Sequence, residues 1–148
     1  MIAVLQRVTR AQVSVDGKTI GAIDHGLVIL LGAMGDDHSE DVRFLVNKIV
    51  GFRIFNDKQG KMNLSIRDVH GAALVISQFT LCGDWRKGRR PSFVNAAPPE
   101  QGRTLYEKFI AELKEAGIPV ESGEFGAMMA VELVNDGPVT FVLDSKKA

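Results

Sequence analysis

The first third of the chain contains apolar and alternating runs that predict β-strands. Met1 to Val8 forms one such run, and Gln12 to Val15 continues it. Asp16-Gly17 is a hairpin dipeptide, so we expect Thr19 to Ile23 to return antiparallel to the first strand. Gly26 to Ala33 is almost wholly apolar, which predicts a buried central strand.

Two other segments show the 3.6-residue period of a helix. Asp36-Asp37 offers an N-cap for the first helix. Pro98-Pro99 opens the second, and Gly117 follows its end. Each helix has one apolar face that we expect to pack on the sheet. These faces are Val42, Leu45, Val46, Ile49 and Val50 in the first helix, and Leu105, Phe109, Ile110 and Leu113 in the second.

Further strands are predicted in the rest of the chain. Arg53 to Phe55 suggests a brief one, and Ala72 to Ile76 and Met128 to Val134 suggest longer ones. Gly137-Pro138 then reverses or bends the chain into Thr140 to Leu143. Strands gathered at both ends around two helices predict an α/β or α+β fold with a mixed or antiparallel sheet. No glycine-rich nucleotide-binding motif is present.

Composition indicates an ordinary globular protein. With 148 residues, 45% apolar and 24% charged, we expect a single domain spanning residues 1–148 with its own core. The single cysteine, Cys82, excludes an internal disulfide. No apolar run is long enough to cross a membrane, and polar residues interrupt the N-terminus, so we expect a cytoplasmic protein.

The formal net charge is zero, from 18 basic and 18 acidic residues, so any nucleic acid must be bound by a local patch. The candidate cluster lies beside Trp85 and consists of Arg86, Lys87, Arg89 and Arg90. Its position soon after a candidate site favours contact with RNA phosphates. A solvated surface loop is the alternative interpretation.

Two short islands carry the candidate chemistry, each at the end of a predicted strand. Ser77 to Leu81 brings together hydroxyl groups, a carboxamide and backbone N–H groups, which suit an acyl or ester group. Asn135 to Thr140 contains Gly137, which lets a ligand approach the backbone, and Pro138, which tolerates a cis bond. Without further information, the second island also fits a simple turn.

The islands SQFTL and NDGPVT, with GRRPSF between them at Gly88 to Phe93, resemble the D-aminoacyl-tRNA deacylase (D-tyrosyl-tRNA(Tyr) deacylase) family. The resemblance extends from the opening MIAVLQRVTRAQVSVDG to FVLDSKK. It implies a barrel-like core of mixed, mainly antiparallel sheet with two main helices outside, assembled as a homodimer. It also implies hydrolysis of the ester between tRNA and a D-amino acid or glycine.

The resemblance places Thr80 at the reaction centre. A threonine hydroxyl needs a base to become a nucleophile, and neither Ser77 nor Gln78 can act as one near pH 7. We therefore expect Thr80 or the adjacent RNA 2′-hydroxyl to orient a water molecule, beside an oxyanion pocket formed by the backbone N–H groups of Phe79 and Thr80. The alternative is a polar strand end with Phe79 in the core.

The resemblance also implies that Gly137-Pro138 is a chiral filter with a cis peptide bond, reaching into the active site of the partner subunit. Its carbonyl groups would bind the substrate amino group and leave no room for an L side chain. Glycine would pass for the same reason. Arg7 is expected to hold this segment, and Phe125 and Met129 to form the pocket wall or to belong to the core.

Other chemistry has little support in the sequence. His25, His38 and His70 stand alone, so we expect no metal and no cofactor. No serine-hydrolase elbow surrounds Ser77, and Cys82 fits a packing role better than a nucleophilic one. We therefore predict a chiral-proofreading hydrolase in translation quality control. The alternatives are a non-catalytic RNA-binding or oligomeric module and a small-molecule D-amino acid esterase.

Overall fold

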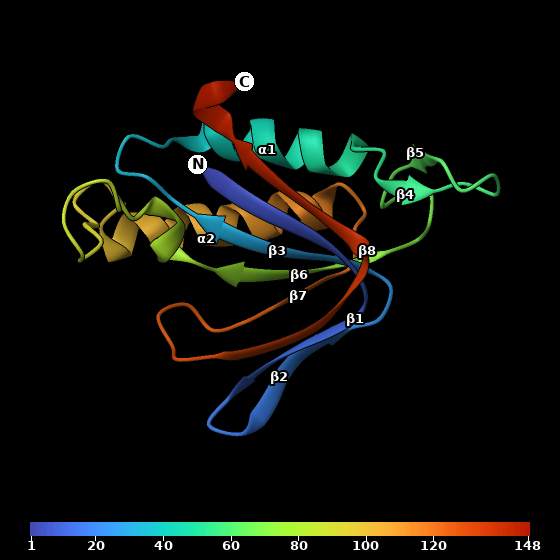
Figure 1. Cartoon of the computed structure of the whole chain (residues 1–148), viewed down its shortest axis with the longest axis horizontal. Coiled ribbons are helices and arrows are strands. Elements are labelled where there is room, and N and C mark those ends of the chain that lie inside the picture. Colours follow the sequence, from blue (N-terminus) through green and yellow to red (C-terminus); the bar gives the residue numbers. More distant parts are fainter.

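The two longest strands, β1 and β8, pair along almost their whole length (Figure 1). The computed structural model describes all residues, 1–148. The strands are β1 (Ile2–Val15), β2 (Lys18–Ile23), β3 (Gly26–Gly32), β4 (Phe55–Asn56), β5 (Met62–Leu64), β6 (Ala72–Ser77), β7 (Val120–Ser122) and β8 (Ala130–Asp144). The α-helices are α1 (Ser39–Gly51) and α2 (Pro99–Glu115), and short 3₁₀ helices are η1 (Phe79–Cys82) and η2 (Ser145–Lys147).

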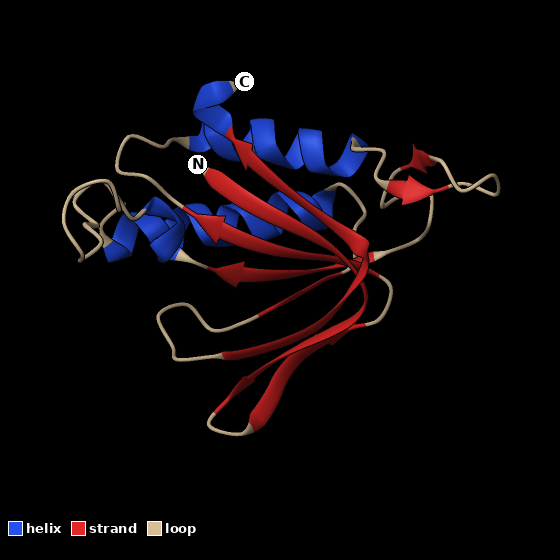
Figure 2. Cartoon of the chain, viewed as in Figure 1, coloured by secondary structure: helices blue, strands red, loops and turns tan.

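The main sheet is mixed, as predicted. Its order is β2-β1-β3-β6-β7, with β8 on β1. β1 is antiparallel to β2, β3 and β8, whereas β3–β6 and β6–β7 are parallel. The sheet curves so far that an ideal Cβ on Gly21 of β2 would lie 2.9 Å from the carbonyl oxygen of Ser122 in β7. This nearly closed, barrel-like sheet with both α-helices outside confirms the expected fold class (Figure 2).

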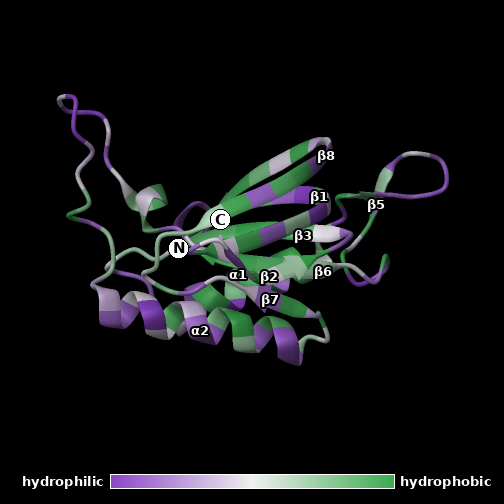
Figure 3. Ribbon diagram, turned by 90° about the horizontal axis from the view of Figure 1, so that it is seen from below, coloured by the Kyte–Doolittle hydropathy of each residue, from purple (hydrophilic) through white to green (hydrophobic).

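The two faces of the sheet carry separate cores. α1 and α2 pack on one face, where the apolar positions predicted for both helices meet the first half of β1 and the strands β3 and β6. The opposite face folds on itself and encloses a smaller cluster from β1, β2, β3 and β6, with Val131 and Leu133 of β8 and the preceding Met129 packed against it. Figure 3 shows β3 and β6 largely green, as expected for strands buried on both faces. No helix combines the length and the apolar character needed to cross a membrane.

The hairpin predicted at Asp16-Gly17 is confirmed, with φ angles of 50° and 77° at the two residues. Other boundaries differ slightly from expectation. The brief strand expected at Arg53 to Phe55 begins only at Phe55, and the strand expected from Met128 begins at Ala130. Gly137-Pro138 does not reverse the chain, since β8 continues through it and stays paired with β1 on both sides.

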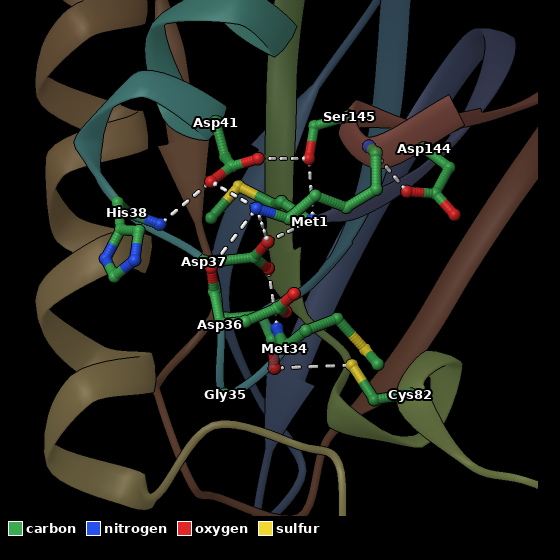
Figure 4. A network of polar contacts seen from close by, with 12 residues as sticks. Met1, Met34, Gly35, Asp36, Asp37, His38, Asp41, Cys82, Asp144 and Ser145 are labelled. Carbon is green, nitrogen blue, oxygen red and sulfur yellow. Dashed lines mark hydrogen bonds and ion pairs between the residues drawn. The ribbon is translucent and has the colours of Figure 1, made fainter. Parts of the chain in front are cut away.

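The predicted N-cap of α1 was wrong by one residue. His38 is the N-cap, and its N–H donates to Oδ2 of Asp41 at 2.9 Å. Asp37 does not cap the helix, because its Oδ1 accepts a hydrogen bond of 2.6 Å from the ammonium group of Met1 (Figure 4). The same ammonium donates to Oγ of Ser145, whose hydroxyl in turn donates to Asp41 at 2.6 Å. This network joins both ends of the chain to the start of α1.

Candidate active site

A pocket of about 800 Å³ opens at the end of β6. This end of the strand lies at the left of the sheet in Figure 1. β6 stops at Ser77, Gln78 donates its N–H to the carbonyl oxygen of Leu31 at 2.8 Å, and the chain then turns into η1. The walls come from four segments. They are Ser77, Gln78, Phe79 and Thr80; Phe93, Ala96, Ala97, Pro98 and Pro99; Gly102 and Tyr106 of α2; and Phe125 to Met129, with Leu31, Ala33, Ile76 and Val131 at the base.

The first island presents its polar groups to this pocket. The Gln78 carboxamide donates to Oγ1 of Thr80, which leaves the Thr80 hydroxyl proton free to be donated elsewhere. Phe79 and Thr80 occupy the first two positions of η1, where backbone N–H groups have no acceptor within the helical turn. The pocket therefore combines one positioned hydroxyl with backbone donors at a strand end.

No charged side chain and no histidine lines the pocket. Thr80 accordingly has no base beside it. Cys82, the last residue of η1, is buried, its thiol donates to the carbonyl oxygen of Ala33 at 3.3 Å, and burial raises its pKa. A protonated, buried thiol is a packing group rather than a nucleophile at neutral pH.

Two pairs of aromatic rings from separate segments form two walls of the pocket. Phe79 is 58% exposed and meets Phe93 edge to face, with ring centroids 5.0 Å apart. The alternative that placed Phe79 in the core is therefore wrong. On the other wall, Phe125 lies 5.8 Å from Tyr106, whose hydroxyl points inward to the carbonyl oxygen of Val75 at 3.0 Å. Met129 lies at the same side of the pocket.

The second island forms a bulge in β8. Val8 pairs with Asn135 and Gln6 pairs with Thr140, so residues 136 to 139 stand opposite Arg7 alone. The side chain of Asn135 spans the bulge, accepting from the N–H of Val139 at 2.7 Å. The loop is thus an ordered insertion in a paired strand and not a free turn.

Arg7 holds this bulge from behind. The Arg7 side chain is buried, with Nε donating to the carbonyl oxygen of Asp136 at 2.9 Å and Nη1 donating to that of Ile54 at 2.8 Å. The Asp136 carboxylate lies 3.6 Å from Arg7 Nε. A buried guanidinium that donates from both Nε and Nη1 fixes the backbone immediately before Gly137.

Gly137 and Pro138 are exposed and joined by a cis peptide bond. Gly137 has a φ of 140°, and an ideal Cβ there would lie 2.7 Å from Cγ2 of Val139. Only glycine fits such a conformation without strain. Neither residue lines the pocket of the same chain. The bulge lies in the middle of β8, where the strand bends at the right of Figure 1, away from the end of β6.

The basic cluster lies in the loop between the paired residues Asp84 and Ser92. Arg86 makes two hydrogen bonds of 2.8 Å to the Asp84 carboxylate and keeps the pKa of that carboxyl well below its usual range. Lys87, Arg89 and Arg90 are exposed and form no ion pair. Three of the four predicted cations are therefore available to an external anion.

A second hollow, of about 700 Å³, lies between the starts of α1 and α2. It is lined by His38, Glu40, Glu100 and Gln101, among others, and its carboxylates disfavour a polyanion. No group of histidine, cysteine or acidic residues is arranged to hold a metal ion.

The comparisons with known proteins identify the family. The model of the D-Tyr-tRNA(Tyr) deacylase family matches residues 4–144. The chain belongs to this family. A relative named D-aminoacyl-tRNA deacylase from Halalkalibacterium halodurans is 58% identical, covering 99% of this chain and 100% of the relative. Another of that name, from Thermosipho africanus, is 56% identical over 99% of both chains.

Solved structures agree with the fold. One described as a c-Myc DNA unwinding element binding protein has a TM-score of 0.93 and 41% identity, covering 97% of this chain and 98% of that one. Another, described as a probable eukaryotic D-amino acid tRNA deacylase, has a TM-score of 0.82 at 18% identity, which supports the fold alone.

Two aromatic residues of the pocket wall, Phe93 and Tyr106, were not among the predicted site residues. Phe93 belongs to the GRRPSF motif but was not assigned a role, although an aromatic residue after a basic loop is a usable signal. Tyr106 was not assigned a role either, although it is a buried residue of α2 next to Leu105 on the predicted apolar face. Phe93 reaches the pocket through a loop, whose path the sequence pattern does not predict.

Proposed function

We propose that this protein is a hydrolase that cleaves the ester between a D-amino acid and the terminal ribose of tRNA. One observation carries the proposal. The pocket at the end of β6 offers backbone donors and the Thr80 hydroxyl without any charged group, in a chain 56% to 58% identical to proteins named for this reaction. Membership of the deacylase family supports the same ester chemistry.

The reaction follows from positioning rather than from a strong base. An aminoacyl ester is already activated, so a bound water can attack the acyl carbon if it is well oriented. The N–H groups of Phe79 and Thr80 would stabilise the negative charge on the acyl oxygen, and the Thr80 hydroxyl or the RNA 2′-hydroxyl would orient the water. Collapse of the intermediate releases the free amino acid and leaves the ribose hydroxyl on tRNA.

Selection is assigned to the Gly137-Pro138 bulge of a second copy of the chain. The bulge is exposed and held rigidly by Arg7, yet it is absent from the pocket of its own chain. Inserted into a partner's pocket, its backbone would bind the substrate amino group and exclude an L side chain. Glycyl-tRNA, which has no side chain, would be accepted. We therefore expect a homodimer that acts in translation quality control in the cytoplasm.

The RNA would be met first by the exposed cations of the basic cluster. Lys87, Arg89 and Arg90 are free to neutralise phosphates, whereas Arg86 is partly satisfied by Asp84. Phe79 precedes the cluster and Phe93 follows it, and the exposed Phe79 ring, in edge-to-face contact with Phe93, offers surface for the terminal base.

The second candidate function is nucleic-acid binding without turnover. It is favoured by the similar structure described as a DNA unwinding element binding protein. In this case, the pocket would bind an unpaired base and Thr80 would have no catalytic role.

One experiment separates these functions. Purified protein is incubated with D-tyrosyl-tRNA, L-tyrosyl-tRNA and D-tyrosine ethyl ester, and released tyrosine is measured. We expect release from D-tyrosyl-tRNA alone. Retention of the RNA without release would support the binding module, and equal cleavage of the simple ester would support a small-molecule esterase.

A further inference from the structure

The pocket must accommodate the end of a negatively charged RNA if the substrate is tRNA. Its walls carry no charge, which suits an uncharged nucleoside and acyl group. The nucleoside at the end of an RNA is nevertheless joined to the rest of the chain by a phosphate, which must lie near the pocket mouth. If the proposed function holds, a cation at that mouth would be the natural partner of this phosphate.

Arg103 is placed for this task. It follows Gly102, a residue of α2 that lines the pocket. Its Cζ lies 4.7 Å from the ring centroid of Phe125, which lines the same pocket. The guanidinium stacked on the Phe125 ring has its direction fixed, while its N–H edge stays exposed. Such an edge can donate two hydrogen bonds to a phosphate.

The charge of Arg103 is also not paired with a carboxylate of the chain. Glu100 and Glu107 lie on the same helix and Glu124 precedes Phe125, yet the one ion pair within α2 joins Lys108 to Glu112. Arg103 makes no ion pair with any of the three. It stands on the Phe125 wall, whereas the basic cluster of residues 86 to 90 leads into the Phe93 wall.

We propose that Arg103 binds the phosphate between the last two nucleotides of the substrate RNA, as a subsite separate from the basic cluster. The contact positions the terminal nucleoside over the pocket. It contributes to binding and not to the chemical step, because Arg103 is not among the residues that line the pocket together with Ser77 to Thr80.

The test compares substrates with and without this phosphate. Arg103→Gln removes the charge while keeping a polar side chain of similar reach. Lys114→Gln, an exposed cation near the end of the same helix, is the matched control. Each variant is assayed with D-tyrosyl-tRNA, with a D-tyrosylated CpCpA trinucleotide and with D-tyrosyl-adenosine, which has no phosphate.

We expect Arg103→Gln to raise KM about tenfold for the two phosphate-bearing substrates, with kcat unchanged, since a charge-assisted hydrogen bond contributes about 1.5 kcal/mol. D-tyrosyl-adenosine and Lys114→Gln should show no change, and Arg103→Lys should restore part of the affinity. An equal rise of KM for D-tyrosyl-adenosine would assign Arg103 to packing of the Phe125 wall and overturn the proposal, as would an unchanged KM for all three substrates.

Binding measurements test the same phosphate subsite without relying on turnover. Calorimetric titration of the unacylated CpCpA trinucleotide and of adenosine into the wild type and Arg103→Gln gives the same contrast. A loss of affinity confined to the trinucleotide supports the phosphate subsite, whether or not the wild type hydrolyses the ester. Absence of hydrolysis by the wild type would overturn the proposed function and not the subsite. Equal affinities for the trinucleotide would overturn the subsite.

Discussion

The pocket at the end of β6 is an uncharged cavity walled partly by loops. The bulge around Gly137, in contrast, is held in place by hydrogen bonds from the buried Arg7. Thr80 is exposed and supported only by Gln78. Arg7, in contrast, is buried and donates to three acceptors: the backbone of Ile54 and Asp136 and the side chain of Asn56. The two regions therefore depend on the rest of the protein in different ways.

If the proposed function holds, this difference shows how the chain divides two tasks. A reaction that needs a positioned water can use a pocket whose side chains contribute little to folding. A filter made of backbone atoms must be rigid, so its supports belong to the core. Changes in the pocket should alter rate without altering stability, and changes behind the bulge should do both.

The largest effect is expected at Thr80. Thr80→Val removes the hydroxyl but not the backbone donors, so kcat should fall about 10- to 1000-fold, the range for losing one polar group in such a site. The unfolding temperature should not change, because the side chain is exposed. Thr9→Val, on the exposed side of β1, is the control for hydroxyl loss.

Rapid-quench mass spectrometry of the wild type checks the role of this hydroxyl. We expect no aminoacyl group on the protein at any time. An adduct on Thr80 would show that it is a nucleophile and would contradict the positioning role.

The next effect is expected at Arg7. Arg7→Met leaves the carbonyl groups of Ile54 and Asp136 without their donor, so the free energy of unfolding should fall by about 2 to 4 kcal/mol in urea titrations. Arg10→Met, an exposed residue of the same strand, should change it by less than about 0.5 kcal/mol. Equal stabilities of the two variants would remove the contrast between pocket and bulge.

The contrast also explains which features could be predicted from sequence. The hairpin at Asp16-Gly17 and the apolar faces of both helices depend on neighbouring residues, and they were correct. The N-cap of α1 failed because Asp37 contacts Met1, which is far away in sequence. Pocket residues such as Phe93 come from loops whose course depends on tertiary packing, so no periodicity marks them.

A smaller effect is expected from acid, in a third region. Burial raises the pKa of Asp41, but hydrogen bonds from Ser145, the His38 N–H and Lys146 outweigh it and lower the pKa to about 2. Because the unfolded state binds this proton more readily, the stabilisation is present above about pH 4 and lost as pH falls toward 2, by at most about 2 kcal/mol. Asp41→Asn should therefore be less stable than the wild type at pH 6 but nearly equal at pH 2. A difference that is constant with pH would contradict this assignment.

The smallest effect is expected in the basic cluster. Replacing Arg89 and Arg90 by glutamine should flatten the dependence of log KM on log salt by about 0.7 to 0.9 for each lost phosphate contact. Arg86→Gln should change the slope less, because Asp84 already neutralises much of its charge. A larger change for Arg86 than for Arg89 would mean that the ion pair opens on RNA binding.

Mixed dimers test the central claim, that the pocket and the filter of one active site come from different chains. Differently tagged Thr80→Val and Gly137→Ala chains are co-expressed, and the mixed dimer is isolated through both tags. Gly137→Ala should distort the bulge and weaken the rejection of L-tyrosyl-tRNA, since the added Cβ would lie 2.7 Å from Cγ2 of Val139. If the filter acts across the dimer, one site combines an intact pocket with an intact bulge, and the mixed dimer should show about half the wild-type rate with wild-type preference for the D substrate. An active mixed dimer that cleaves L-tyrosyl-tRNA as readily as the Gly137→Ala homodimer would contradict the account, because each pocket would then use the bulge of its own chain.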